Sequence, residues 1–219
     1  MKRLSNGTIA IIVIVAVIFI DQFIKIWVKT HFYYGEELLI TDWFRLLFIE
    51  NNGMAFGMEI GSKLLLTAFR IIAVIAFCYY LWKIRHRFDL PKGYVICVAM
   101  ITAGALGNVI DCIFYGVIFN APHFPHVAEL FPDGGGYGSL FQGRVVDMLY
   151  FPLCEWNWPE WMPWVGEEHF VFFQPIFNVA DASLCVSVAI LILFYAKYLS
   201  SLDETTTQNE DLPADEKMD

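Results

Sequence analysis

Four long apolar stretches constrain the fold more than any other feature of this sequence. A helix needs about 20 mainly apolar residues to cross the hydrocarbon core of a bilayer. The stretches that meet this requirement are Ile9–Val28, Leu64–Trp82, Tyr94–Phe114 and Phe177–Tyr195. Hydrophobic residues make up 58% of the 219 residues and charged residues only 17%, a composition too apolar for a soluble domain. The sequence therefore predicts a membrane protein with four transmembrane helices.

The positions of the basic residues predict how the chain is oriented, because Lys and Arg concentrate on the cytoplasmic side. Lys2 and Arg3 precede the first stretch, and the short link between the second and third stretches is also basic. The two long connections, about 30–62 and 115–176, have only Arg45 and Arg144 well inside them. We expect both termini in the cytoplasm and both long loops outside.

The two ends of the chain differ in character. A cleavable leader is not expected at the N-terminus, because Asp21-Gln22 follows the first apolar run in place of a small-x-small site. From Asp203 the chain carries seven acidic residues against Lys217 and few apolar ones. We expect a single membrane domain over 1–200 and a disordered, acidic, cytoplasmic tail over 201–219. The remainder is close to neutral, so no nucleic-acid partner is expected.

The two outer loops carry different patterns. Alternating apolar residues at Leu38–Ile40 and Phe44–Ile49 predict two short strands before Asn51-Asn52-Gly53, a turn signal. In the second loop, Gly134–Gly136 and several prolines predict an irregular first half. Four tryptophans follow within nine residues, which is typical of a segment at the membrane interface: Trp156, Trp158, Trp161 and Trp164.

The five cysteines predict neither a disulfide framework nor a metal site. Four lie inside the apolar stretches, where Cys behaves as a small apolar residue, and only Cys154 lies in a loop. His residues show no metal-ligand spacing either. We expect no metal and no cofactor.

Ionisable side chains inside a span are costly, about 2.5–3.5 kcal/mol each at the centre, so each one needs a reason. Three polar pairs have helical spacing that places both members on one face. They are Asp21 with Lys25, Asn108 with Asp111 just after the small residue Gly104, and Asn178 with Asp181. Counted from the expected span ends, their carboxylates all lie near the outer surface.

A fourth carboxylate, Asp147, lies in the apolar run Arg144–Leu149, which we expect to re-enter the bilayer surface. Two close carboxylates in an apolar site share one proton. One can then accept a proton from a water that attacks a peptide carbonyl, while the other donates to the carbonyl oxygen. This grouping predicts acid–base hydrolysis.

Structural explanations compete with this one. Asp147 alone could be an ordinary loop carboxylate, and Asn178 with Asp181 a favourable helix start. Asn108 and Asp111 could join helices by hydrogen bonds, and Asp21–Lys25 fits a structural ion pair better than a proton-transfer group. Arg70, one or two turns into the second span, is expected to extend to the outer headgroups.

Two other classes of function remain open at this point. Intramembrane Asp, Asn and Lys residues also mark proton-coupled transporters, although here they gather at one leaflet, and four helices leave little room for two inverted halves. A structural subunit would leave the carboxylates unexplained. A cleavage assay on a lipidated precursor separates the peptidase from both.

Five blocks of sequence resemble those of lipoprotein signal peptidases (signal peptidase II), in the same order. The blocks are Asp21-Gln-Phe-Ile-Lys25, Asn51-Asn-Gly-Met-Ala-Phe56, Gly104-Ala-Leu-Gly-Asn108-Val-Ile-Asp111, Val145-Val-Asp147 and Phe177-Asn178-Val-Ala-Asp181. The resemblance covers all four spans and both outer loops, from about residue 8 to about residue 198. A lone Asn-x-x-Asp would be a weak signal, whereas five blocks in order on the expected topology are a specific one.

The resemblance implies a fold and an activity. The fold is an all-α membrane protein with four helices, a small extracytoplasmic β-cradle from the first loop and a mobile cover from the second. The activity is that of an aspartic endopeptidase of the bacterial inner membrane, which cuts a diacylglyceryl-modified prolipoprotein just before its lipidated cysteine. We expect a monomer in contact with phospholipid, with its active site at the outer face.

The resemblance also assigns residues. It makes Asp147 and Asp181 the catalytic pair, and its supporting or substrate-binding residues are Asp21, Lys25, Asn51, Gly104, Asn108, Asp111 and Asn178. The chain departs from the family pattern in two places. Cys112 stands where an Arg usually follows Asp111, which leaves Asp111 without that basic partner and makes Arg70 or Arg144 a candidate replacement. The second loop is also longer than usual, around His123–Gly143 and Glu155–Glu168.

Overall fold

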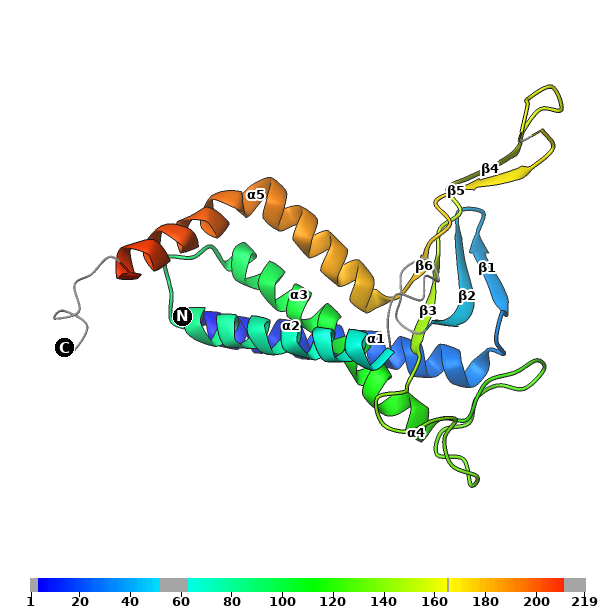
Figure 1. The fold of residues 1–219 in the computed structure, drawn as a ribbon, viewed down its shortest axis with the longest axis horizontal. Helices are drawn as coiled ribbons and strands as arrows, with labels where there is room; N and C mark the ends of the chain where they lie inside the picture. Colours follow the sequence, from blue (N-terminus) through cyan, green and yellow to red (C-terminus); the bar gives the residue numbers. More distant parts are fainter. Residues whose placement is uncertain (1–3, 52–62, 165, 211–219) are drawn as a thin grey trace.

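The protein has a bundle of apolar helices with a small β-sheet at one end (Figure 1). The structure is a computed structural model that describes residues 4–51, 63–164 and 166–210. The long helices are α1 (Asn6–His31), α2 (Lys63–Ile84), α3 (Lys92–Ile110) and α5 (Val179–Glu210). After α3 the chain continues as a π-helical turn, η2 (Asp111–Tyr115), and a short α4 (Gly116–Ile118).

The four apolar stretches predicted from the sequence are confirmed as helices long and apolar enough to cross a membrane. In the apolar window of α3, 67% of the residues are buried, against 17% in those of α1 and α2, so α3 is the central helix. The outer helices direct large apolar side chains away from the protein, and Phe19 and Phe69 are each 68% exposed. In a bilayer, acyl chains solvate such side chains.

Two glycines allow α3 to approach its neighbours closely. A Cβ atom on Gly104 would lie 2.4 Å from the Ala180 carbonyl oxygen at the start of α5. A Cβ atom on Gly107 would lie 2.8 Å from Asp21 Oδ2 on α1. Any side chain at these two positions would push the helices apart. Gly104 therefore acts through packing, by bringing the polar residues of three helices together.

The β-structure is larger than the sequence predicts. The main sheet has the order β1-β2-β3-β6, with all neighbours antiparallel. The predicted strands of the first loop are confirmed as β1 (Glu37–Thr41) and β2 (Phe44–Asn51), while the turn after Asn51 lies outside the described residues. The second loop supplies β3 (Val145–Tyr150) and β6 (Ile176–Phe177). The label all-α was thus too narrow.

The prediction that the Asp147 segment is an apolar run re-entering the bilayer surface was wrong. Residues Val145–Tyr150 form β3, which lies between β2 and β6 in the sheet. On one side of the sheet β3 packs on α1 and η2, where Val28, Phe48, Tyr115, Val146 and Met148 belong to one buried cluster. The run is apolar because protein, and not lipid, covers it.

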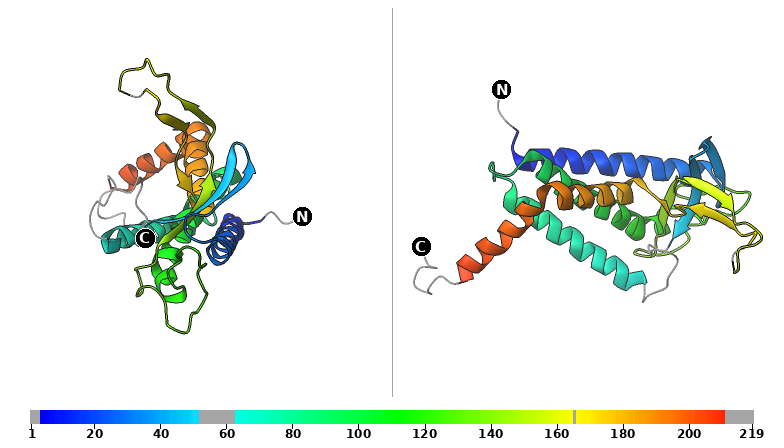
Figure 2. Two further views of the ribbon diagram at one scale, coloured as in Figure 1. Left: turned by 90° about the vertical axis from the view of Figure 1, so that its right-hand side faces the viewer. Right: turned by 90° about the horizontal axis from the view of Figure 1, so that it is seen from above.

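The tryptophan segment forms a separate antiparallel ribbon, β4 (Cys154–Asn157) and β5 (His169–Phe172), which projects beyond the main sheet (Figures 1 and 2). Trp156 packs on Phe170, with ring centroids 4.4 Å apart, whereas Trp164 is 96% exposed. The placement of this ribbon at the membrane interface stays a prediction. At the C-terminus α5 continues to Glu210, into the stretch expected to be disordered.

Candidate active site

The centre of the site is a buried lysine with two carboxylates. Lys25 and Asp21 lie one turn apart on α1, and Lys25 Nζ is 2.9 Å from Asp21 Oδ2. The same Nζ is 2.7 Å from Asp111 Oδ2, at the end of α3. All three side chains are at most 1% exposed. The expected Asp21–Lys25 ion pair is therefore confirmed, and it extends across to a second helix.

Lys25 is also the basic partner of Asp111, a role for which the sequence had left Arg70 and Arg144 as candidates. Arg70 Nη1 lies 3.5 Å from Cys112 Sγ, and the extension of Arg70 to the headgroups stays a prediction. Arg144 Nη1 lies 3.4 Å from Glu50 Oε2. The residue that follows Asp111 in sequence therefore need not be basic in this chain.

Gln22 completes this cluster, although it is not among the site residues predicted from the sequence. Its Nε2 donates to Asp111 Oδ1 at 2.8 Å and to Asp21 Oδ2 at 3.1 Å. Its Oε1 accepts a hydrogen bond from the Tyr115 hydroxyl at 3.1 Å. Its position next to Asp21, as a second polar residue within an apolar span, was the available signal.

The start of α5 is held by two side chains. Asn178 Oδ1 accepts a hydrogen bond from the Asp181 backbone N–H at 2.9 Å, the geometry of a helix N-cap. Asp21 Oδ1 accepts from the Ala180 backbone N–H, also at 2.9 Å. These contacts satisfy two of the backbone donors that a helix start leaves free, and they fix α5 against α1.

The amides of Asn108 and Asn178 connect the two predicted catalytic carboxylates. Asn108 Nδ2 donates to Asp181 Oδ1 at 2.7 Å, and Asn178 Nδ2 donates to Asp147 Oδ1 at 2.7 Å. Asn178 Nδ2 also lies 3.1 Å from Asn108 Oδ1, which accepts from Lys25 Nζ at 2.9 Å. A chain of hydrogen bonds thus links the lysine cluster to both carboxylates.

Asp147 receives a second amide, because Asn51 Nδ2 donates to its other oxygen, Oδ2. Asn51 lies at the end of β2, opposite β3 in the sheet. Asp147 is 2% exposed, whereas Asp181 is only partly buried. Burial, and next the charge of Asp181, raises the pKa of Asp147 to about 8. At neutral pH Asp147 is therefore mainly protonated and can act as an acid.

The structure brings all the predicted site residues to one end of the bundle. Eight of them form one network of hydrogen bonds and ion pairs, namely Asp21, Lys25, Asn51, Asn108, Asp111, Asp147, Asn178 and Asp181. Gly104 contributes through the close packing of α3 on α5. Fold and site together define a class of protein: a multi-pass membrane protein with a carboxylate pair where its helices meet a small sheet.

Comparison with known proteins identifies the family. The model of the signal peptidase (SPase) II family matches residues 13–197, so the chain belongs to this family. The lipoprotein signal peptidase of Porphyromonas gingivalis is 44% identical over 219 residues, which covers 96% of each chain. The lipoprotein signal peptidase of Amoebophilus asiaticus is 36% identical over 181 residues, 80% of this chain and 72% of its own.

Solved structures support the fold. A bacterial membrane enzyme determined by the in meso method at 2.3 Å resolution matches with a TM-score of 0.56. The match covers 93% of each chain at 22% identity. At this identity the likeness shows the fold alone.

Proposed function

We propose that Asp147 and Asp181 are the catalytic pair of an aspartic endopeptidase that cleaves a prolipoprotein just before its diacylglyceryl-modified cysteine. As a member of the signal peptidase II family, the protein removes signal peptides from prolipoproteins. The observation that carries the assignment of the pair is the amide bridge, in which Asn178 and Asn108 each hold one oxygen of one carboxylate.

The different surroundings of the two carboxylates suit different roles. Asp147 is buried and mainly protonated at neutral pH, so it would donate a proton to the carbonyl oxygen of the scissile bond. Asp181 is partly exposed, and as the other member of the pair it would accept a proton from the attacking water. The amides of Asn51, Asn108 and Asn178 aim the oxygens that take part. Two carboxylates and one water supply this chemistry without a cofactor.

The position of the pair supports a lipid-modified substrate. Asp181 lies in the first turn of the apolar helix α5, and Asp147 lies in the strand beside it. The pair is therefore at the end of a predicted span, where we propose the outer surface of the bacterial inner membrane to be, with both termini in the cytoplasm. Two acyl chains in the bilayer contribute about 0.8 kcal/mol per buried CH₂, so they would hold the adjacent peptide bond at this depth.

The test is cleavage of one prolipoprotein in two forms, with and without the diacylglyceryl group, by the purified protein in liposomes. We expect rapid cleavage of the lipidated form, unaffected by excess chelator, and little cleavage of the unmodified form. Equal rates for the two precursors would contradict the proposed substrate. Loss of activity in chelator that a metal restores would contradict the aspartic mechanism.

A further inference from the structure

A second buried ion pair lies beside the proposed catalytic pair, and no role has been assigned to it. Lys29 lies one turn after Lys25 on α1, and Glu50 lies on β2 directly before Asn51. The Lys29 ammonium contacts the Glu50 carboxylate, and these side chains are 0% and 1% exposed. Removing two charges from water is costly unless their contacts are good, so the pair needs a role.

The surroundings of the pair are aromatic. Lys29 Nζ lies 5.1 Å from the ring centroid of Phe119, 5.3 Å from that of Tyr137 and 5.9 Å from that of Phe48. These rings exclude water and attract the cation through their faces. Lys29 is therefore fixed in position and directs its ammonium to a single carboxylate.

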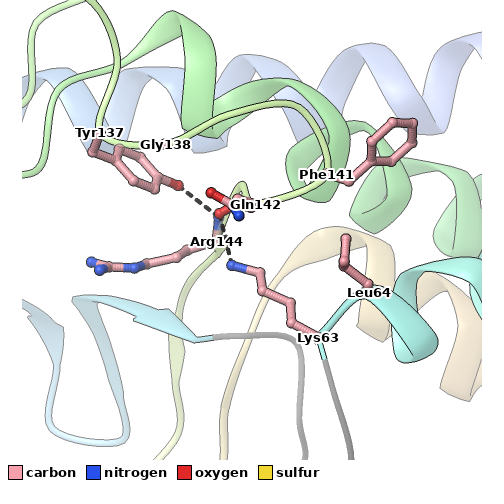
Figure 3. A pocket seen from close by; sticks show the side chains of 7 residues that line it. All are labelled: Lys63, Leu64, Tyr137, Gly138, Phe141, Gln142 and Arg144. Carbon is pink, nitrogen blue, oxygen red and sulfur yellow. Dashed lines mark hydrogen bonds between the residues drawn. The ribbon is translucent and has the colours of Figure 1, made fainter.

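Arg144 contacts the same carboxylate from the next strand. It directly precedes β3, and its Nη1 lies 3.4 Å from Glu50 Oε2. Its backbone N–H donates to the Tyr137 hydroxyl at 2.6 Å, and its guanidinium Cζ lies over the Tyr137 ring, 5.1 Å from the centroid. Arg144 also lines a surface cavity of about 320 Å³ with Tyr137, Gln142 and Lys63 (Figure 3). Glu50 thus joins a buried cation from α1 to an accessible one at the start of β3.

The strand register places this group directly behind the proposed catalytic pair. Glu50 pairs with Val146, and its neighbours Asn51 and Ile49 pair with Val145 and Asp147. Successive side chains of a strand point to opposite faces, so a contact that holds Glu50 on one face also holds Asn51 on the other. The pairing of β2 with β3 shifts register between Leu46 and Ile49. The regular hydrogen bonds nearer the hairpin therefore do not by themselves fix how Glu50 and Asn51 align with β3.

We propose that Lys29, Glu50 and Arg144 form a positioning clamp, which holds the end of β2 against β3 so that the Asn51 amide stays on the Asp147 carboxylate. None of the three touches the reacting atoms. The proposal rests on the proposed function, because it assumes that Asp147 takes part in catalysis. The clamp ties together α1, β2 and the start of β3 through one carboxylate.

The test compares Glu50→Gln with the wild-type protein in a cleavage assay across a range of pH. We expect kcat per folded molecule to fall about 10- to 100-fold, the effect of a small misplacement of a catalytic group, with little change in KM. The Asn51 hydrogen bond favours the ionised form of Asp147, so weakening it raises the pKa further. The charged neighbours of Asp147, namely Asp181, Lys25 and Asp111, stay in place. The alkaline limb of the kcat profile should therefore move to higher pH in Asn51→Ala and in a variant that removes the buried pair without leaving a buried charge, whereas in Glu50→Gln the Lys29 and Arg144 cations act against this shift.

Two further variants separate positioning from simple stability. In Lys29→Met/Glu50→Leu, apolar side chains of similar size replace the pair, which restores packing without charge. We expect a melting temperature near that of the wild type, the low kcat of Glu50→Gln and the shifted profile of Asn51→Ala. In the control Arg45→Met, ion pairs to Glu37 and Glu155 are lost elsewhere on β2, and kcat and profile should not change.

Wild-type kcat in both Glu50→Gln and the double variant, with an unchanged pH profile in the double variant, would overturn the clamp. Asp147→Asn, assayed in parallel, keeps this outcome distinct from a failure of the proposed function. If Asp147→Asn is inactive while the clamp variants are normal, only the clamp is wrong. If Asp147→Asn also cleaves normally, the catalytic assignment is wrong.

Discussion

The surroundings of Asp147 change the chemistry of its side chain. In water an aspartic acid has a pKa of about 3.9, whereas burial and the charge of Asp181 raise the pKa of Asp147 to about 8 in the folded protein. The folded protein therefore keeps this proton over a pH range in which the unfolded chain has released it. Its stability must fall as the pH rises through that range.

Substitution of Asp147 tests this predicted fall of stability with rising pH. The contribution of Asp147 to the free energy of unfolding is fully favourable below about pH 4, and it is lost progressively as the pH rises from about 4 to about 8. Asn does not ionise, so Asp147→Asn should melt above the wild type at pH 8, by an amount that shrinks toward pH 5. Melting curves in detergent from pH 5 to 8 measure the difference. Asp42→Asn, an exposed control between β1 and β2, should not reproduce it. A difference that grew toward acid pH would contradict the assignment.

Sequence patterns identified the residues at the centre of the site but not all of their contacts. Helical spacing correctly paired Asp21 with Lys25, because both lie on one helix. It could not show that Lys25 also contacts Asp111, since that contact depends on how α1 packs on α3. Helical spacing also places Lys29 one turn after Lys25, but it gives no partner for Lys29, because only the fold brings Glu50 to it.

At the scale of elements, Asn178 has two separable roles. Its side-chain oxygen caps α5, and its amide nitrogen holds Asp147 and Asn108. A serine caps helices about as well as asparagine, but it has no amide to donate to Asp147. The two roles can therefore be removed one at a time.

Asn178→Ser and Asn178→Ala should differ in stability but not in catalysis. Both variants lose the amide that positions Asp147, and kcat should fall about 10- to 100-fold in each, the effect of a small misplacement of a catalytic group. Only the alanine variant loses the cap, at a cost of about 1 kcal/mol. Melting temperatures and kcat for the two proteins check this. A serine variant with full activity would show that the amide bridge does not matter for catalysis.

The helices could be predicted from sequence because each is a long local pattern. The predicted Leu64–Trp82 differs from α2 by one residue at its start and two at its end. Strand β3 could not be found in the same way. Its apolar residues pair with β2, about a hundred residues earlier in the chain, and no local signal encodes that pairing. The catalytic assignment of Asp147 came from the resemblance and not from a correct view of its local structure.

At the scale of the whole molecule, the orientation in the membrane stays a prediction from the basic residues. The chain itself offers a probe. Cys154 is exposed at the start of β4, whereas Cys97 and Cys112 are buried, and Cys78 and Cys185 lie on the predicted spans α2 and α5. An impermeant thiol reagent should distinguish Cys154 from the other four.

We expect such a reagent to label intact spheroplasts that contain the wild-type protein, because the second loop should face outward. Cys154→Ser should abolish the labelling. Labelling that appears only after the membrane is permeabilised would place Asp147 on the cytoplasmic side and contradict the proposed reaction.

The most direct test of the account is the activity of Asp147→Asn, Asp181→Asn and the double variant on a lipidated prolipoprotein. Asparagine is nearly isosteric with aspartate, so each change removes an ionisable group and little packing. Acid–base groups contribute about 10²–10⁴-fold each, and groups that act as a unit are not additive. Each single variant should be folded and lose at least about 10²-fold in kcat, and the double variant should be barely worse than either. A folded Asp147→Asn protein with near-normal kcat would contradict the account and direct attention to Asp111 with Asp181.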